Sequence, residues 1–350
     1  MFRNYSYDPK DPSDKHSFEI YDVDVSVVNG IRRTILTDIP VVGIIGDHVQ
    51  VIKNNGPLHN EIISHRIGLL PICLTEDETE NYQDGSIELE LNVLNEGNAM
   101  RNVSTADIKG SKDDKELSKK ELEKMFPAHQ VTKSHILITR LRTNEQLHFK
   151  ASLVKDTARH NAAFSPVSLC NFFYVQDPGL AKKKDNVLDK ERAYYTNKYG
   201  DANVMKFEIE PINKLMTPKY MVNKAFEIII DKLNNLITTI STEDFAPVAF
   251  QDLKSTFDFT FQNEDDTLGN IIMSHIHNKY VREDKTALDN IYCTYVGYIC
   301  PHPLKTEMIL RITLEDQINP STFIRFLESN CRTIIDELTN MKKEWNSFAS

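Results

Sequence analysis

The sequence predicts an α+β protein made of two similar halves, with a β-rich domain inserted in the first half. Three observations support this prediction. Residues 25–40 form a short helix with one apolar face, two longer amphipathic helices follow at 218–240 and 320–346, and the segments between them alternate as strands do. Both ends of the chain thus share one order of elements: strand, short helix, strands, long helix.

The first half begins with a polar stretch and then its short helix. Residues 1–15 are polar and contain proline, which predicts a flexible arm, and residues 16–21 predict a strand. Asp22 or Asp24 is suited to cap the helix that follows, and Pro40 ends it because the residue before proline avoids the α region. The apolar residues of this helix recur at three- and four-residue steps: Val25, Val28, Ile31 and Ile35.

Two adjacent arginines, Arg32 and Arg33, lie beside this apolar stripe. Paired guanidinium groups without aromatic neighbours are more typical of contacts with carboxylates of a protein than of phosphate binding. We therefore predict a helix that packs on one neighbour and forms ion pairs with another.

The insertion is predicted over residues 41–203. Most of its elements are strands, and a short helix covers 61–67. The segments 109–124 and 182–200 are highly charged, and we interpret them as a solvated helix or loop and a connector. The predicted strands are rich in β-branched residues or alternate between apolar and polar residues, and they cover 41–52, 86–94, 135–141 and 146–153.

The first half resumes with a strand at 204–209 and ends near 245, after which residues 241–248 predict a linker. The second half, 250–350, has strands at 257–261, 291–299 and 308–314 and a helix at 265–276. The two long helices each expose an apolar face that a small domain cannot cover, so we expect them to pack on each other. The residues predicted at this contact are Phe226, Ile230, Leu233, Ile237, Leu327, Ile334, Leu338 and Met341.

Composition restricts the function. The 350 residues carry a formal net charge of −10, which argues against a protein whose whole surface binds nucleic acid. The chain has no run of eighteen apolar residues and its first residues form no apolar signal segment, so we expect neither a membrane helix nor secretion. The five cysteines are scattered, as in proteins of reducing compartments.

Metal and catalytic motifs are weak. His59, Glu61 and His65 do not have the spacing of zinc hydrolases, and Cys300 with His302 is half a site without a second pair at zinc-ribbon spacing. There is no glycine-rich phosphate loop and no nucleophile elbow. Asp22-Val-Asp24 is a pair rather than the aspartate triplet that holds magnesium in polymerases.

Three segments of the first half resemble a known family. They are Val25-Ser-Val-Val-Asn-Gly-Ile-Arg-Arg-Thr-Ile-Leu-Thr-Asp-Ile-Pro40, Asn60-Glu-Ile-Ile-Ser-His-Arg-Ile-Gly-Leu-Leu-Pro71 and Ala158-Arg-His-Asn-Ala-Ala-Phe-Ser-Pro166. In this order they are similar to the alpha-type assembly subunits of multisubunit DNA-directed RNA polymerases, represented by the third-largest subunit of polymerase II and its archaeal counterpart.

The second half resembles the small alpha-type partner, which is the eleventh subunit of polymerase II or the archaeal protein that corresponds to it. The resemblance rests on Asp266-Thr-Leu-Gly-Asn270, on Val296-Gly-Tyr-Ile-Cys-Pro-His-Pro303 and on the terminal helix. In cells the two partners are usually separate chains, whereas this sequence joins them head to tail. A fusion of this kind is what we expect of polymerases encoded by large DNA viruses. The resemblance covers about 16–350 and predicts a discontinuous first dimerisation half, 16–40 plus 204–245.

The resemblance implies a non-catalytic platform on which the two largest polymerase subunits and small subunits assemble, with no separate alpha-type partner. No direct contact with DNA and no membrane contact are expected. Magnesium belongs to the catalytic subunits, and the cysteine cluster that holds zinc or iron–sulfur in some relatives has no counterpart between Cys73 and Cys170. An intracellular location follows: the nucleus for a cellular protein, the virion or a cytoplasmic virus factory for a viral one.

We expect the partner-binding surface to include Asn29, Arg32, Arg33, Glu61, His65, Arg66, Arg159, His160 and Asn270, with the two asparagines at equivalent helix starts. Two other classes stay open. An unrecognised enzyme would show substrate-dependent activity as an isolated chain. A nucleic-acid-binding or general interaction scaffold would use the lysine-rich segment 182–192 and show steeply salt-dependent binding.

Overall fold

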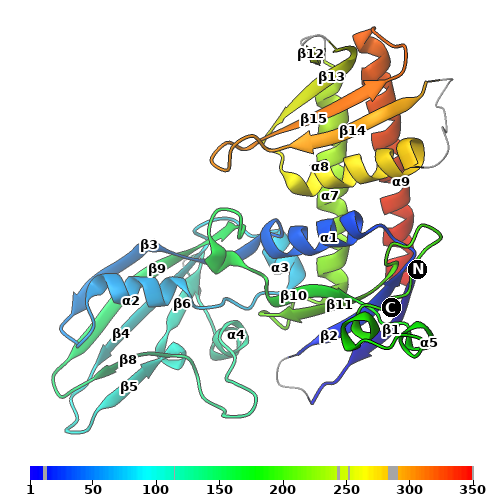
Figure 1. Cartoon of the computed structure of the whole chain (residues 1–350). Helices are drawn as coiled ribbons and strands as arrows, with labels where there is room; N and C mark the ends of the chain where they lie inside the picture. The colour runs from blue at the N-terminus through cyan, green and yellow to red at the C-terminus, as the bar shows by residue number, and fades with distance from the viewer. Residues whose placement is uncertain (11–13, 114, 243–244, 251–252, 283–290, 349–350) are drawn as a thin grey trace.

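The computed structural model describes residues 1–10, 14–113, 115–242, 245–250, 253–282 and 291–348. Parts of the predicted arm (11–13), of the charged segment 109–124 (114), of the linker (243–244) and of the second half (251–252, 283–290 and 349–350) lie outside these residues. The fold is α+β with two sheet-and-long-helix halves in one chain and a β-rich insertion in the first half (Figure 1). The predicted fold class is confirmed.

The first half is built on an antiparallel sheet with the order β1-β2-β11-β10. Phe18 of β2 lies opposite Phe207 of β11, and both rings are buried and stacked 5.3 Å apart. These strands and the two helices of this half have the bounds β1 Phe2–Tyr7, β2 His16–Tyr21, α1 Val25–Thr37, β10 Val167–Tyr174, β11 Val204–Pro211 and α7 Pro218–Ile240.

Two predictions about this half need correction. The flexible arm over 1–15 is wrong for its first part, because Phe2–Tyr7 pairs with β2 and the Phe2 ring packs on Trp345 at 5.2 Å. Residues 167–174 fall inside the predicted insertion, yet they form β10, which pairs with β11 along its length. Alternation alone does not say which sheet a strand joins, so neither pairing could be seen in the sequence.

The second half repeats the plan with the sheet order β12-β13-β15-β14. Its inward side chains, such as Phe259 opposite Leu310, are fully buried against the helices. The elements are β12 Val248–Phe250, β13 Leu253–Gln262, α8 Asp266–Ile276, a π-helical turn His277–Arg282, β14 Cys293–Ile299, β15 Glu307–Leu314 and α9 Pro320–Phe348.

The insertion has its own hydrophobic core, separate from that of the halves. Its main sheet has the order β3-β9-β4-β6-β7, and β5 pairs with β8. The strands are β3 Val41–Asn54, β4 Ile87–Leu94, β5 Arg101–Ser104, β6 Lys109–Lys112, β7 Lys115–Glu116, β8 Leu137–Leu141 and β9 Gln146–Asp156. The helices are α2 Asn60–Gly68, α3 Glu76–Glu80 and α4 Lys119–Met125, and the connector to β11 contains α5 Pro178–Ala181 and α6 Val187–Glu191.

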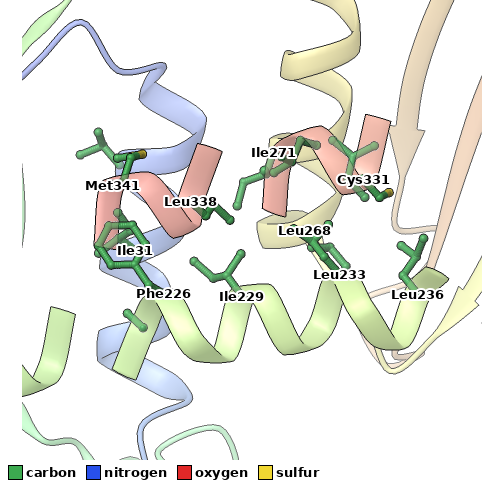
Figure 2. Packing of buried hydrophobic residues seen from close by; sticks show 14 of the residues in the cluster. Ile31, Phe226, Ile229, Leu233, Leu236, Leu268, Ile271, Cys331, Leu338 and Met341 are labelled. Carbon is green, nitrogen blue, oxygen red and sulfur yellow. The ribbon is translucent and has the colours of Figure 1, made fainter. Parts of the chain in front are cut away.

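The buried hydrophobic residues of the two halves form one continuous cluster. Helices α7 and α9 are antiparallel in it, because Trp345 near the end of α9 donates from Nε1 to the carbonyl of Lys219 at the start of α7 (3.2 Å). Figure 2 shows side chains of α1, α7, α8 and α9 meeting in this cluster. Each long helix thereby extends from one sheet toward the other (Figure 1).

Candidate functional site

The site centres on helices α1 and α8, which lie antiparallel across the junction of the two halves. Both begin at an aspartate that caps the helix, Asp24 for α1 and Asp265 for α8, and each carboxylate accepts the amide of the residue two positions on at 2.8 Å. Asp24 therefore fulfils the cap prediction. The helices approach closely at Gly30, where a Cβ would lie 2.7 Å from Cδ1 of Ile271.

At one end of this helix pair, the cap of α1 binds the other half. Asp24 accepts hydrogen bonds from Ser274 Oγ at 2.9 Å and from Asn278 Nδ2 at 2.8 Å, and these donors lie at the end of α8 and in the turn after it. The carboxylate that begins one helix is thus held by the end of the other.

The opposite end has the reciprocal arrangement with charged donors. Arg33, near the end of α1, donates from Nε to Thr267 Oγ1 at 2.8 Å, and its Nη2 lies 3.6 Å from Asp265 Oδ2. Arg159, from the loop after β9, donates from Nη1 to the same Oδ2 at 3.0 Å. Although burial raises the pKa of Asp265, hydrogen bonds from Thr267 and Arg159 hold it at about 2.

A second carboxylate, Asp38 at the end of α1, completes this cluster. Its Oδ1 accepts from Arg159 Nε at 3.0 Å and Nη2 at 2.7 Å, and its Oδ2 lies 2.9 Å from Lys232 Nζ on α7. Burial raises the pKa of Asp38, but Lys232, Thr37 and Arg159 outweigh it and bring the pKa below its ordinary value. Three cations and three carboxyl groups meet here, and they come from both halves and from the insertion. Their contacts fix the placement of these three parts of the chain relative to one another.

The third carboxyl group of the cluster, Glu264, has weaker polar contacts than the two aspartates. Its side chain is 15% exposed, and Lys232 Nζ lies 3.8 Å from Oε2, too far for a hydrogen bond. Within the described residues Oε2 has no hydrogen-bond partner. Burial, together with the nearby Asp265 and Asp38, raises the pKa of Glu264 to about 7. This carboxyl therefore titrates near neutral pH.

The structure brings some of the predicted partner-binding residues together and leaves others apart. Arg33 and Arg159 meet through Asp265, and the carboxylate that pairs with Arg33 belongs to the same chain. Arg32 donates to Asn29 Oδ1 at 3.0 Å on its own helix. Asn29 and Asn270 are each the fifth residue of their helices, so the prediction that they serve the helix starts is wrong; the aspartate caps do so.

The remaining predicted residues lie on the insertion. Glu61, His65 and Arg66 are exposed on α2, and Arg66 donates to the carbonyl of Leu137 at 2.8 Å. His160 is exposed and lies 2.7 Å from Asp156 Oδ1. The hydrogen bonds and ion pairs of the described residues do not link α2 to Arg33 and Arg159. Partner binding by all these residues stays a prediction.

The residues predicted between the long helices are buried in the shared cluster, apart from Ile230, which is partly buried and packs against it. On α7 the inward position is Ile229 rather than Ile230. Sequence reasoning missed Asp38, Lys232 and Glu264, because their partners come from distant segments.

The described residues show neither a metal-ligand cluster nor a membrane-spanning helix. Among the described residues, no group of three or more His, Cys, Asp or Glu is arranged to hold a metal ion. The helices of the described chain include none that is long and apolar enough to cross a membrane. Of the cysteines, Cys300 is partly exposed and the others are buried.

Comparison with known proteins identifies the family. The model of the RNA polymerase Rpb3/Rpb11 dimerisation domain matches residues 17–233, and a second model with this description matches residues 256–344. The chain belongs to the Rpb3/Rpb11 dimerisation domain family. The first match runs from β2 into α7 and includes the insertion, and the second runs from β13 into α9, so each half has its own match to the dimerisation domain.

Curated relatives agree with this assignment. The chain is 29% identical to DNA-directed RNA polymerase II subunit rpb3 of Dictyostelium discoideum over 51% of its length and 61% of the relative. It is 27% identical to subunit RPAC1 of polymerases I and III of Saccharomyces cerevisiae (45% and 52%), and 26% identical to subunit Rpo3 of Methanosphaera stadtmanae (49% and 62%). These matches span half to three-fifths of the relatives.

Proposed function

We propose that this protein is a non-catalytic assembly-platform subunit of a DNA-directed RNA polymerase. One observation carries the proposal: two Rpb3/Rpb11 dimerisation domains match successive parts of one chain, and their long helices pack in one core. In this proposal the chain is an intramolecular counterpart of a dimer of two alpha-type subunits. It needs no separate alpha-type partner and acts inside the cell.

The partners we propose are the two largest polymerase subunits, docked on the outer side of α1, on α2 and on the loop that contains His160. Helix α2 and the loop offer exposed charged or polar residues, whereas Arg32 on α1 is half-buried. Apolar residues lie beside them: Ile62 is 50% and Leu69 is 56% exposed on and after α2. Mixed surfaces of this kind are typical of protein interfaces, in which a few apolar and arginine residues supply most of the binding energy. Catalysis and its magnesium belong to the large subunits in this proposal.

A native pull-down tests the proposal. The tagged chain is recovered from its source under mild conditions, its partners are identified by mass spectrometry, and the eluate is assayed for DNA-templated RNA synthesis. Two very large partners together with RNA synthesis would support the platform function. A chain recovered alone and inactive would overturn it. Salt-sensitive binding of nucleic acid by the isolated chain would favour the alternative scaffold.

The isolated chain is expected to be a folded monomer. Helix α9 covers the apolar face of α7, so the surface that would drive association with another alpha-type chain is already buried. Light scattering at several concentrations measures the mass directly. An obligate homodimer would contradict the expectation.

Arg32→Glu is expected to leave the fold intact and to reduce recovery of the large subunits by about tenfold or more. The side chain donates only to Asn29 of its own helix among the described contacts, so the charge reversal costs little stability. Arg33→Glu is unsuitable, because it places a carboxylate beside Asp265. The matched control is Arg332→Glu on the exposed side of α9, which changes the charge equally. Equal recovery of the large subunits with both variants would remove Arg32 from the interface.

A further inference from the structure

The loop of residues 159–163 is exposed and is held by an anchor at each end. At the far end, Phe164 is 1% exposed and packs over Gly43, where a Cβ would lie 2.9 Å from the ring. At the near end, the backbone amide of Arg159 donates to the carbonyl of Thr37 at 3.0 Å, and its guanidinium binds two carboxylates. Arg159 thus connects the loop to the end of α1, while the amides of His160 and Asn161 donate to the carbonyl of Thr157 within the loop's own segment.

The two carboxylates bound by Arg159 come from different halves. Asp38 belongs to the end of α1 in the first half, and Asp265 begins α8 in the second. Asp265 is rigidly placed, since its Oδ1 caps α8 while its Oδ2 accepts from Arg159. A shift of α8 relative to α1 would move Oδ2 away from the guanidinium. The contact between the loop and Asp265 thus depends on how the two halves pack against each other.

The other end of the helix pair is arranged differently, because among the described hydrogen bonds and ion pairs no arginine binds the capping aspartate. Asp24 caps α1 and accepts from Ser274 and Asn278, which is the same chemistry at the pseudo-equivalent position. Its hydrogen-bond partners are neutral and belong to the helix pair and the turn after it, whereas Arg282 of this turn binds Asp201 of the connector. The arginine that reaches in from the insertion is thus an addition at the Asp265 end.

We propose that Asp265 is a positioning residue, which couples the placement of the 159–163 loop to the packing of the second half on α1. The consequence for docking rests on the proposed function. In that case, a large subunit that binds this loop binds tightly only when both halves are in place. The positioning itself concerns the isolated chain and does not depend on that function.

The test is hydrogen exchange of the full-length chain with the single change Asp265→Asn. Asparagine still caps a helix, but it places an amide beside Arg159 instead of a carboxylate. Amides of residues 159–164 are expected to exchange roughly threefold to tenfold faster, whereas those within α8 stay protected. Asp24→Asn is the matched control: it removes the equivalent charge at the other end and is expected to leave the loop unchanged.

A second variant approaches the same contact from the loop. Arg159→Gln retains the pairing of Arg33 with Asp265 and is expected to accelerate exchange of residues 160–164 without loosening α1 or α8. Unchanged loop exchange in Asp265→Asn would overturn the proposal even if Arg159→Gln changes it, because Arg159 also binds Asp38. Equal loop exchange in Asp24→Asn and Asp265→Asn would overturn it as well.

Capture of the large subunits by the same variants separates this inference from the proposed function. Faster loop exchange with reduced capture supports both. Faster exchange with full capture keeps the positioning role but removes the loop from the docking surface. Failure of the wild-type chain to capture any polymerase subunit would overturn the function alone.

Discussion

Leu338→Asp is expected to lower the free energy of unfolding of the joined halves by about 5 kcal/mol or more. Leu338 is 1% exposed on α9 and lies in the cluster where α1, α7, α8 and α9 meet (Figure 2). The change removes an apolar side chain from this core and places a carboxylate among buried apolar side chains. Because domains are stable by only about 5–15 kcal/mol, the packing of the halves should be lost or nearly lost.

The measurement uses the single tryptophan of the chain. Trp345 is fully buried against Phe18 of the first sheet, with 4.6 Å between ring centroids, so its fluorescence reports the contact of α9 with the first half. Denaturant titrations of wild type and Leu338→Asp are compared with those of Asn340→Asp, which adds the same charge at an exposed position of α9. The control should lie within about 0.5 kcal/mol of wild type. Similar stability of the two variants would show that α9 does not hold the halves together.

Glu264→Gln is expected to stabilise the protein at pH 8 by on the order of 3 kcal/mol, and much less at pH 5. Burial raises the folded-state pKa of Glu264 from 4.5 to about 7. For such a group, the stability it contributes is fully present below the unfolded pKa and is lost as pH rises through the folded pKa. The loss therefore occurs between about pH 4.5 and pH 7, and glutamine, which does not titrate, avoids it.

The same fluorescence titration at pH 5 and pH 8 checks this expectation. Asp266→Asn is the control, because it removes a neighbouring carboxylate that is exposed at the start of α8. A gain for Glu264→Gln that is equal at the two pH values would mean that the glutamate is not protonated in the folded protein. A loss of stability at pH 8 would mean that its attraction to Lys232 outweighs the cost of burial.

The long helices could be predicted from the sequence because their pattern is local. Apolar residues recur at helical spacing over many turns, and Pro218 and Pro320 occupy the first position of α7 and α9, where proline is favoured. Asp24 was equally visible as a cap before an apolar stripe. The repeated order of elements in the two halves followed from the same local signals.

The sheet partners and the ion cluster could not be predicted in the same way. β10 follows the strands of the insertion in the sequence, and its hydrogen bonds to β11 assign it to the first half. Asp38 and Lys232 read as ordinary surface charges, and Arg159 was predicted to bind a partner protein rather than Asp38 and Asp265 of its own chain. These residues lie in four segments that only the fold brings together. The raised pKa of Glu264 likewise arises from burial, which no local pattern reveals.

The short passage of the chain from Ile240 at the end of α7 to Val248 in β12 has a consequence for biosynthesis. Two separate subunits must be made in balanced amounts and must meet by diffusion, at a rate that falls with dilution. Two halves on one polypeptide are always present in equal number, and the short tether keeps each at an effective concentration of the order of millimolar for the other. In the proposed intramolecular dimer, pairing is unimolecular, and it proceeds equally well however little of the protein is made.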